Sequence, residues 1–377
     1  MRLAVGLVLV FLMLVLVAVS IAAWNAQHRA DRAEWPANLG TLADAPKHFP
    51  ARPANEAANE LVKRAAYLGI DLSPASRPER EEAGYAFHDA GEYLHKHVKF
   101  VEGKIEPPPP SVAQFLSTHA EPLDALREQI LHGGPIEWEV NLASPVGPAP
   151  PGPWGVRTLN RVLFASALVK ASAGDTHAWD DLHASWLVMR SMWVQPELNT
   201  IATASSGTRD INALARLMSR PAPAWFEEVQ TFDMHRPPLA AAQGDAWRLL
   251  HTTTSRVSLF RVMPLLIAPS VEALRRQATE AAALPPCTYR DTVKVSGSQA
   301  FAAMYAPLLK SAMMDAALGD LERESTERIM RLRSGEPASA TSRCPGLSWS
   351  ADGGVLRLSG EPAVKEDDMH VALELRY

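Results

Sequence analysis

Two histidines and three aspartates lie within nine residues of the segment ASAGDTHAWDDLHASW (171–186). Imidazole and carboxylate groups are the ligands that zinc and other divalent metals use in proteins. The spacing argues against a shared ion, because His177 and His183 are six residues apart and are therefore separated by about 240° around a helix. Asp180 and His183 can meet on one flank. A metal site here would need ligands from elsewhere in the chain.

The same segment carries an apolar stripe that fixes how its polar residues point. The stripe follows helical steps of three and four and consists of Trp179, Leu182, Trp186, Met189 and Trp193. Such a stripe is typical of a helix face buried in a core. The histidines and aspartates then belong to a solvated face. Gly174 and Asp175, just before it, have the chemistry of a helix stop and a fresh helix start.

A second set of possible ligands has better geometry. His88, Glu92 and His95 in HDAGEYLHKHV stand at positions i, i+4 and i+7, which is one face of a helix. Imidazole, carboxylate and imidazole on successive turns can bind a divalent ion. The same pattern is common on the exposed side of amphipathic helices. We therefore expect no metal and no other cofactor, and keep these three residues as the candidates to test.

A polar patch, Ser205-Ser206-Gly207-Thr208-Arg209-Asp210, interrupts a segment that otherwise predicts a helix. We interpret it as a turn or a tightly packed helix contact. A functional pocket is the alternative.

Known catalytic signatures are missing: the chain contains no GxGxxG, GxxxxGK[ST], GxSxG, HExxH or CxxC motif. This favours a non-enzymatic protein over an enzyme. The net charge of -5 provides no basic surface for phosphate backbones, so nucleic acid is not an expected partner.

The first 24 residues predict a transmembrane helix. Leu3 to Trp24 contains no charged residue, and 22 helical residues extend roughly 33 Å, enough for a hydrocarbon core of about 30 Å. A cleaved signal peptide is the alternative, but its apolar region normally spans only about 7 to 15 residues. We expect an uncleaved single-pass anchor in the inner membrane, with the bulk of the chain on the periplasmic side.

The chain has two cysteines, Cys287 and Cys344. An even count is compatible with a disulfide in an oxidising compartment. Two free thiols in a reducing compartment are the alternative.

Composition and periodicity divide the rest of the chain into five parts. They are an extended proline-bearing spacer (25–55), a helical subdomain (56–132), a strand with a Pro/Gly-rich connector (133–157), a main helical domain (158–336) and a small β hairpin or sheet unit (337–377). The strand at 136–142 has strict alternation and is expected to join or pack beside the C-terminal sheet.

Glycine-aspartate pairs at 174, 244 and 319 resemble one another and suggest repeated helical hairpins. The predicted class is therefore mainly α: a transmembrane helix, a body that is either a multi-helix bundle or solenoid-like, and a small antiparallel β unit with a turn at Asp352-Gly353.

From these features we expect a membrane-tethered envelope protein with a helical binding or scaffold domain that holds a protein or peptide partner. Two alternatives stay open: an envelope hydrolase or metal-dependent enzyme, and a structural subunit of a membrane assembly.

Overall fold

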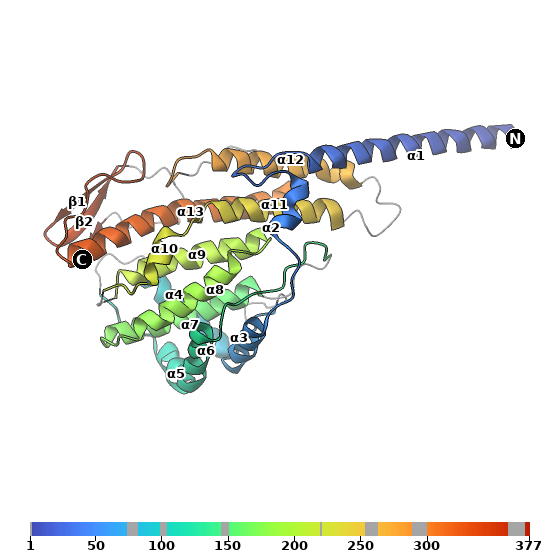
Figure 1. Cartoon of the computed structure of the whole chain (residues 1–377). Coiled ribbons are helices and arrows are strands. Elements are labelled where there is room, and N and C mark those ends of the chain that lie inside the picture. Colours follow the sequence, from blue (N-terminus) through green and yellow to red (C-terminus); the bar gives the residue numbers. More distant parts are fainter. Residues whose placement is uncertain are drawn as a thin grey trace.

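The computed structural model describes residues 2–73, 82–98, 104–144, 151–218, 221–252, 263–288, 300–360 and 374–377. It consists of a long N-terminal helix, a body of packed helices and a three-stranded antiparallel sheet near the C-terminus (Figure 1). The predicted mainly helical class is confirmed.

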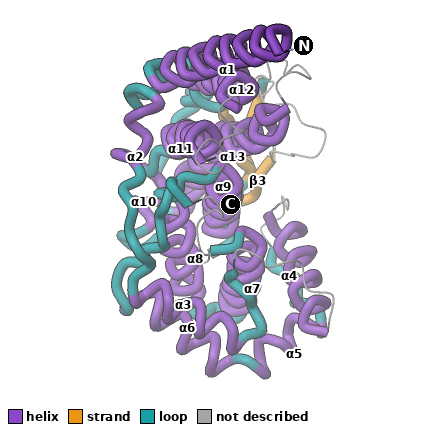
Figure 2. Tube along the Cα trace, turned by 90° about the vertical axis from the view of Figure 1, so that its right-hand side faces the viewer, coloured by secondary structure: helices purple, strands orange, loops and turns teal. Residues whose placement is uncertain are grey.

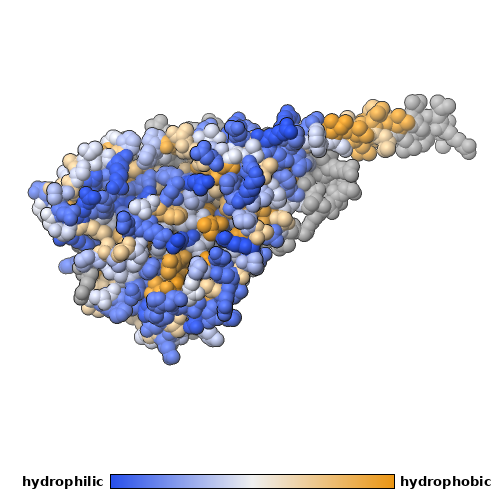
Figure 3. Space-filling model, in the orientation of Figure 1, coloured by the Kyte–Doolittle hydropathy of each residue, from blue (hydrophilic) through white to orange (hydrophobic). Residues whose placement is uncertain are grey.

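Helix α1 (Arg2–Asp31) projects from the body, and the coloured surface of its projecting part is apolar (Figure 3). An 18-residue window within Val10–Asp31 has a mean hydropathy of 2.0, and by length and composition α1 could cross a membrane. The side chains of residues 10–17 are 42% to 66% exposed. Trp24, 63% exposed, stands where the apolar run ends.

Residues 25–55 differ from the extended spacer that their prolines predict. α1 continues to Asp31 and packs on α12 (Met263–Ala282), with Ala23 and Ala26 buried. The next segment contains the short helices η1 (Leu42–Asp44) and α2 (Ala45–His48). Trp35, Leu39 and Leu42 are buried in the main core, so burial of these apolar side chains holds the segment against the body.

A buried glutamine fastens the same segment to α11 (Arg236–Thr252). The Nε2 atom of Gln243 donates to the carbonyl oxygens of Leu39 (3.1 Å) and Thr41 (2.7 Å). The junction between α1 and the body is thus a packed structure.

Four helices form the N-terminal part of the body: α3 (Glu56–Tyr67), α4 (Glu82–Val98), α5 (Pro110–Thr118) and α6 (Ala120–His132). Leu61 of α3 and Leu126 of α6 belong to the same apolar core as Trp186 and Leu318. The expected helical subdomain therefore shares one core with the main helical region.

The predicted strand at 136–142 is not a strand of the C-terminal sheet. Only Val140 forms a β-bridge, with Arg52, and both backbone N···O distances are 2.9 Å. Trp138 is buried, and its Nε1 atom donates to Ser191 Oγ at 2.8 Å. The alternation therefore arises because every second side chain of an extended segment packs on the helical body.

The main helical region contains α7 (Pro153–Ser172), α8 (Ala178–Met192), α9 (Leu198–Ala215), α10 (Phe226–Thr231), α11, α12 and α13 (Ala300–Arg333). The predicted apolar stripe of α8, with Trp193 just after the helix, is buried along its whole length. Gly174 has φ +72°, the left-handed conformation expected of a residue that closes α7.

The other two glycine-aspartate pairs do not form turns, so the repeated-hairpin hypothesis is wrong. Gly244 lies inside α11 and Gly319 inside α13. A Cβ at Gly244 would lie 2.9 Å from the carbonyl oxygen of Pro196, and one at Gly319 would lie 2.8 Å from Sδ of Met234. Close approach between packed segments therefore explains both glycines.

The body is packed as a bundle around α9. This helix contacts α4, α7, α8, α11 and α13, whereas a unit of a solenoid contacts only its sequence neighbours. α1 and α12 lie along one edge of the body, and α3, α5 and α6 lie at the opposite edge (Figure 2).

The C-terminal sheet has the order β1 (Ser348–Asp352), β2 (Val355–Ser359), β3 (Glu374–Arg376). Asp352 pairs with Val355, so the two turn residues are Gly353 and Gly354, both with positive φ, and the predicted turn is shifted by one residue.

Cys287 and Cys344 form a disulfide with a Cα–Cα distance of 5.3 Å. Both belong to a small core that joins the sheet to the C-terminal part of α13, including Leu321 and Ile329. The crosslink ties the loop after α12 to the sheet.

Candidate functional site

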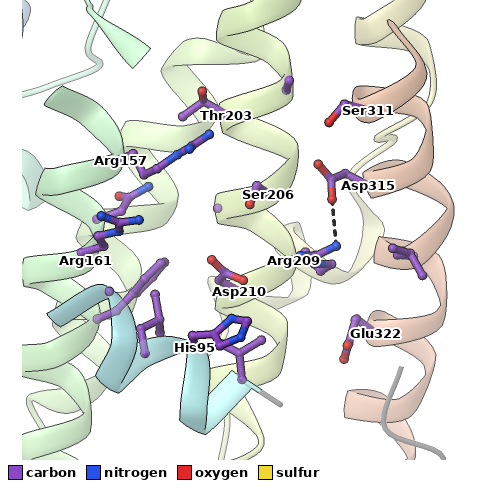
Figure 4. A pocket seen from close by; sticks show the side chains of 18 of the residues that line it. His95, Arg157, Arg161, Thr203, Ser206, Arg209, Asp210, Ser311, Asp315 and Glu322 are labelled. Carbon is purple, nitrogen blue, oxygen red and sulfur yellow. Dashed lines mark hydrogen bonds and ion pairs between the residues drawn. The ribbon is translucent and has the colours of Figure 1, made fainter. Parts of the chain in front are cut away.

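A polar cavity of about 590 Å³ lies between four helices, α4, α7, α9 and α13. Its volume falls within the range of roughly 300 to 1,000 Å³ of small-molecule sites. Figure 4 shows that arginine, serine, histidine and carboxylate side chains face it from these helices.

Two arginines project from α7 into the cavity (Figure 4). Arg157 and Arg161 are four residues apart, so they stand one turn apart on one face of the helix. Arg157 is exposed, and its guanidinium carbon lies 5.1 Å from the ring centre of Trp154. Arg161 is half-buried.

The Arg161 guanidinium packs against α4 at Gly91. A Cβ atom at Gly91 would lie 3.0 Å from Cζ and 3.1 Å from Nε of Arg161. Burial lowers the pKa of Arg161, and the charge of Arg157 lowers it further, while Asp210 and Glu92 act in the opposite direction. The negative charges near Arg161 are thus too weak to offset the effect of burial on its pKa.

The wall formed by α9 contains the polar patch that the sequence shows at 205–210. The patch is helical, which excludes the expected turn. A Cβ at Gly207 would overlap Sδ of Met189, so α9 and α8 are tightly packed there. Ser206, Arg209 and Asp210 line the cavity. The patch is therefore both a tight helix contact and a cavity wall.

Burial raises the pKa of Asp210 to about 6. The charge of Arg209 opposes the rise, and those of Asp315 and Glu322 contribute to it. Asp210 is thus a carboxyl group whose ionised form is disfavoured by its surroundings.

The two carboxylates of α13 that line the cavity, Asp315 and Glu322, have arginine partners from α9 or its C-terminal end. Arg209 Nη1 lies 2.8 Å from Asp315 Oδ1, and Arg216 pairs with Glu322. These ion pairs hold α9 against α13, and their charges are balanced within the protein.

The structure brings the candidate ligands His88, Glu92 and His95 to the rim of this cavity, where all three are exposed. Within the described part of the chain, no group of three or more His, Cys, Asp or Glu side chains could hold a metal ion. The helical face predicted for the three residues is confirmed by α4.

The histidine- and aspartate-rich segment that begins α8 lies outside the cavity lining. His177 Nδ1 lies 2.8 Å from Asp175 Oδ1 at the helix start, and the ring of His183 stacks on Trp225 with 4.4 Å between ring centres.

Asp181 of the same segment is fully buried, and sequence reasoning placed it on a solvated face. It accepts hydrogen bonds from Arg127 (3.2 Å), Ser166 (2.7 Å) and Lys170 (2.8 Å). These contacts join α6, α7 and α8, so the role of Asp181 is structural.

Sequence reasoning also missed Arg157 and Arg161. The available signal was their spacing of four on a helix whose other residues are mostly apolar, because such a pair points two charges in one direction.

The chain matches no protein-family model, no curated protein and no solved structure. The geometry of the cavity and of α1 is therefore the basis for a functional proposal.

Proposed function

We propose that the chain is a membrane-tethered, non-enzymatic binding module. α1 anchors it as a single span in the inner membrane, the helical body lies on the periplasmic side, and the ligand occupies the cavity between α4, α7, α9 and α13. The observation that carries the proposal is this cavity, with a guanidinium group that is half-buried without an ion-pair partner among the described residues.

The exposed apolar surface of α1 supports a membrane location. Side chains that are about half exposed over residues 10–17 favour a hydrocarbon environment over water. The packed junction with α12 supports an anchor that stays attached to the body.

The disulfide supports the periplasmic side. A crosslink between Cys287 and Cys344 persists in an oxidising compartment and is reduced in the cytosol.

Location can be tested with C-terminal fusions of the full chain. An alkaline phosphatase fusion is expected to be active, because this enzyme folds on the periplasmic side. A green fluorescent protein fusion is expected to be dark, because this protein becomes fluorescent on the cytosolic side. Carbonate washing should leave the protein in the membrane pellet. The opposite fusion pattern would place the body in the cytosol and reject this part of the proposal.

Binding can be tested by native mass spectrometry of the full chain purified in a mild detergent. We expect a retained small molecule that is lost in Ser206→Trp, in which an indole fills the cavity. The control is Ser117→Trp, a substitution of an exposed serine on α5. The absence of any cavity-dependent mass would reject the binding proposal.

An envelope hydrolase is the second candidate, and one observation favours it. Asp210 has a pKa raised to about 6 beside a cavity, which suits a general acid or base near neutral pH. Multiple turnovers of a bound compound, abolished by Asp210→Asn, would favour this alternative over the binding module.

A further inference from the structure

Four charged side chains line the cavity without an oppositely charged contact partner in the part of the chain that the structure describes: Arg157 and Arg161, and Glu92 and Asp210. Among the described residues, none of the four forms an ion pair or a hydrogen bond through its charged group. They act on one another through space, since Asp210, Glu92 and Arg157 all affect the pKa of Arg161. Two positive and two negative groups thus face one space without neutralising each other by contact.

The positive pair is built to receive an oxyanion. Arg157 and Arg161 repel each other, and the Arg161 guanidinium is held against Gly91 rather than by a carboxylate. A guanidinium in a fixed position binds a carboxylate or phosphate with little loss of side-chain entropy, because its donors are already oriented.

The negative pair argues against a ligand that is only an anion. Glu92 and Asp210 lie close enough to Arg161 to influence its charge, so they would repel a second negative group. Burial and the charges of Asp315 and Glu322 raise the pKa of Asp210, so they disfavour its ionised form. An ammonium group next to the oxyanion would instead stabilise that ionised form.

We propose that the cavity binds a small zwitterion, such as an amino acid or a short peptide, with its carboxylate on Arg157 and Arg161 and its ammonium group facing Asp210 and Glu92. This inference rests on the proposed binding function and specifies its ligand class. Ser206 and Ser311, which also line the cavity, offer hydroxyl groups to the polar atoms between the two charges.

Isothermal titration calorimetry on the full chain in detergent tests the inference with three probes: dialanine, N-acetyl-dialanine and dialanine amide. Dialanine should bind. The acetylated probe, which lacks the ammonium group, and the amide, which lacks the carboxylate, should each bind at least about tenfold more weakly, since each loses a charge-assisted hydrogen bond.

Variants assign each charge to its partner. Arg161→Ala should weaken dialanine binding about tenfold or more, and Asp210→Asn should remove the preference for dialanine over N-acetyl-dialanine. The matched control is Arg190→Ala on α8, an exposed arginine paired with Glu228. Circular dichroism melting would establish that each variant is folded.

Each outcome decides. Equal binding of dialanine and N-acetyl-dialanine would overturn the proposal that the ligand is a zwitterion and would leave a site for an oxyanion. If none of the probes binds, the inference is rejected. The binding function itself stands or falls separately, on whether native mass spectrometry finds a molecule that Ser206→Trp excludes.

Discussion

The guanidinium of Arg161 packs against Gly91, where a Cβ atom would come within 3.0 Å of Cζ. Gly91→Ala should therefore affect stability and binding in opposite directions. Alanine is favoured over glycine inside a helix by about 0.5–1 kcal/mol, so the melting temperature should stay equal or rise. The Arg161 side chain must shift, so dialanine affinity should fall several-fold. Calorimetry and thermal melting of the same sample measure both; a stabilised variant with unchanged affinity would contradict the positioning role of Gly91.

Asp181 connects three helices, and its loss should be costly. Asp181→Ala leaves Arg127 and Lys170 without their shared carboxylate in a buried site. Breaking such a pair costs about 3–5 kcal/mol, which lowers the melting temperature of a chain of this size by roughly 5 °C. Asp180→Ala, at the neighbouring half-buried position, is the matched control and should change the melting temperature little. Equal effects of the two substitutions would refute the special role of Asp181.

Asp210 should make stability depend on pH. Its pKa rises from 3.8 in the unfolded chain to about 6 in the folded protein, so the folded state keeps the proton longer. The protein therefore loses stability as pH rises from about 4 to about 6, by at most about 3 kcal/mol. Asp210→Asn should be more stable than the parent at pH 7, and this advantage should vanish below about pH 4. Melting curves of both proteins across this range check the sign; a difference that does not vary with pH would count against it.

The disulfide should contribute strongly to stability. Cys287 and Cys344 are 57 residues apart, and closing such a loop stabilises the folded state by about 4 kcal/mol in the chain-entropy model. Dithiothreitol should lower the melting temperature of the parent protein. It should leave the double variant Cys287→Ala/Cys344→Ala unaffected. No response of the parent protein would mean that the crosslink does not constrain the unfolded chain.

Gln243 should stabilise the junction between α1 and the body. Gln243→Leu leaves the carbonyl groups of Leu39 and Thr41 without this donor, at a cost of about 1–3 kcal/mol for a buried unpaired group. Limited proteolysis should then cut faster within residues 32–55. Gln114→Leu, at an exposed position on α5, should leave the rate unchanged.

Local sequence patterns were sufficient to predict the helices of the body and their buried faces. The stripe from Trp179 to Trp193 and the glycine at 174 predicted how α8 begins and packs, because 3.6-residue periodicity and left-handed glycine act over a few residues. The cysteine pair and the hairpin near Gly353 are likewise visible in the sequence.

Features that depend on tertiary packing were not predictable in the same way. The prolines of residues 25–55 and the absence of a regular apolar period there suggested a spacer. Leu39 and Leu42 are nevertheless buried against apolar side chains of other helices. Alternation at Trp138 and Val140 indicated a strand, although the partner surface is helical. Gly244 and Gly319 resembled turn residues, and only the positions of Pro196 and Met234 reveal why glycine is needed.

The cavity combines both cases. The sequence shows the patch at Ser206 and Asp210 and the helical face of His88, Glu92 and His95. It does not show that both border one cavity with α7 and α13, because only the folded bundle brings these helices together. Arg161 and Glu322 are far apart along the chain, so no local pattern indicates that they border one space.

If α1 spans a bilayer, its packing on α12 limits where the protein can act. In a bilayer the tilt of the membrane helix would set the tilt of the body, and the mouth of the cavity would stay at a constant height above the lipid. The cavity mouth would lie no farther from the lipid than the thickness of the folded body. A ligand would therefore enter the cavity from the aqueous layer that this thickness spans.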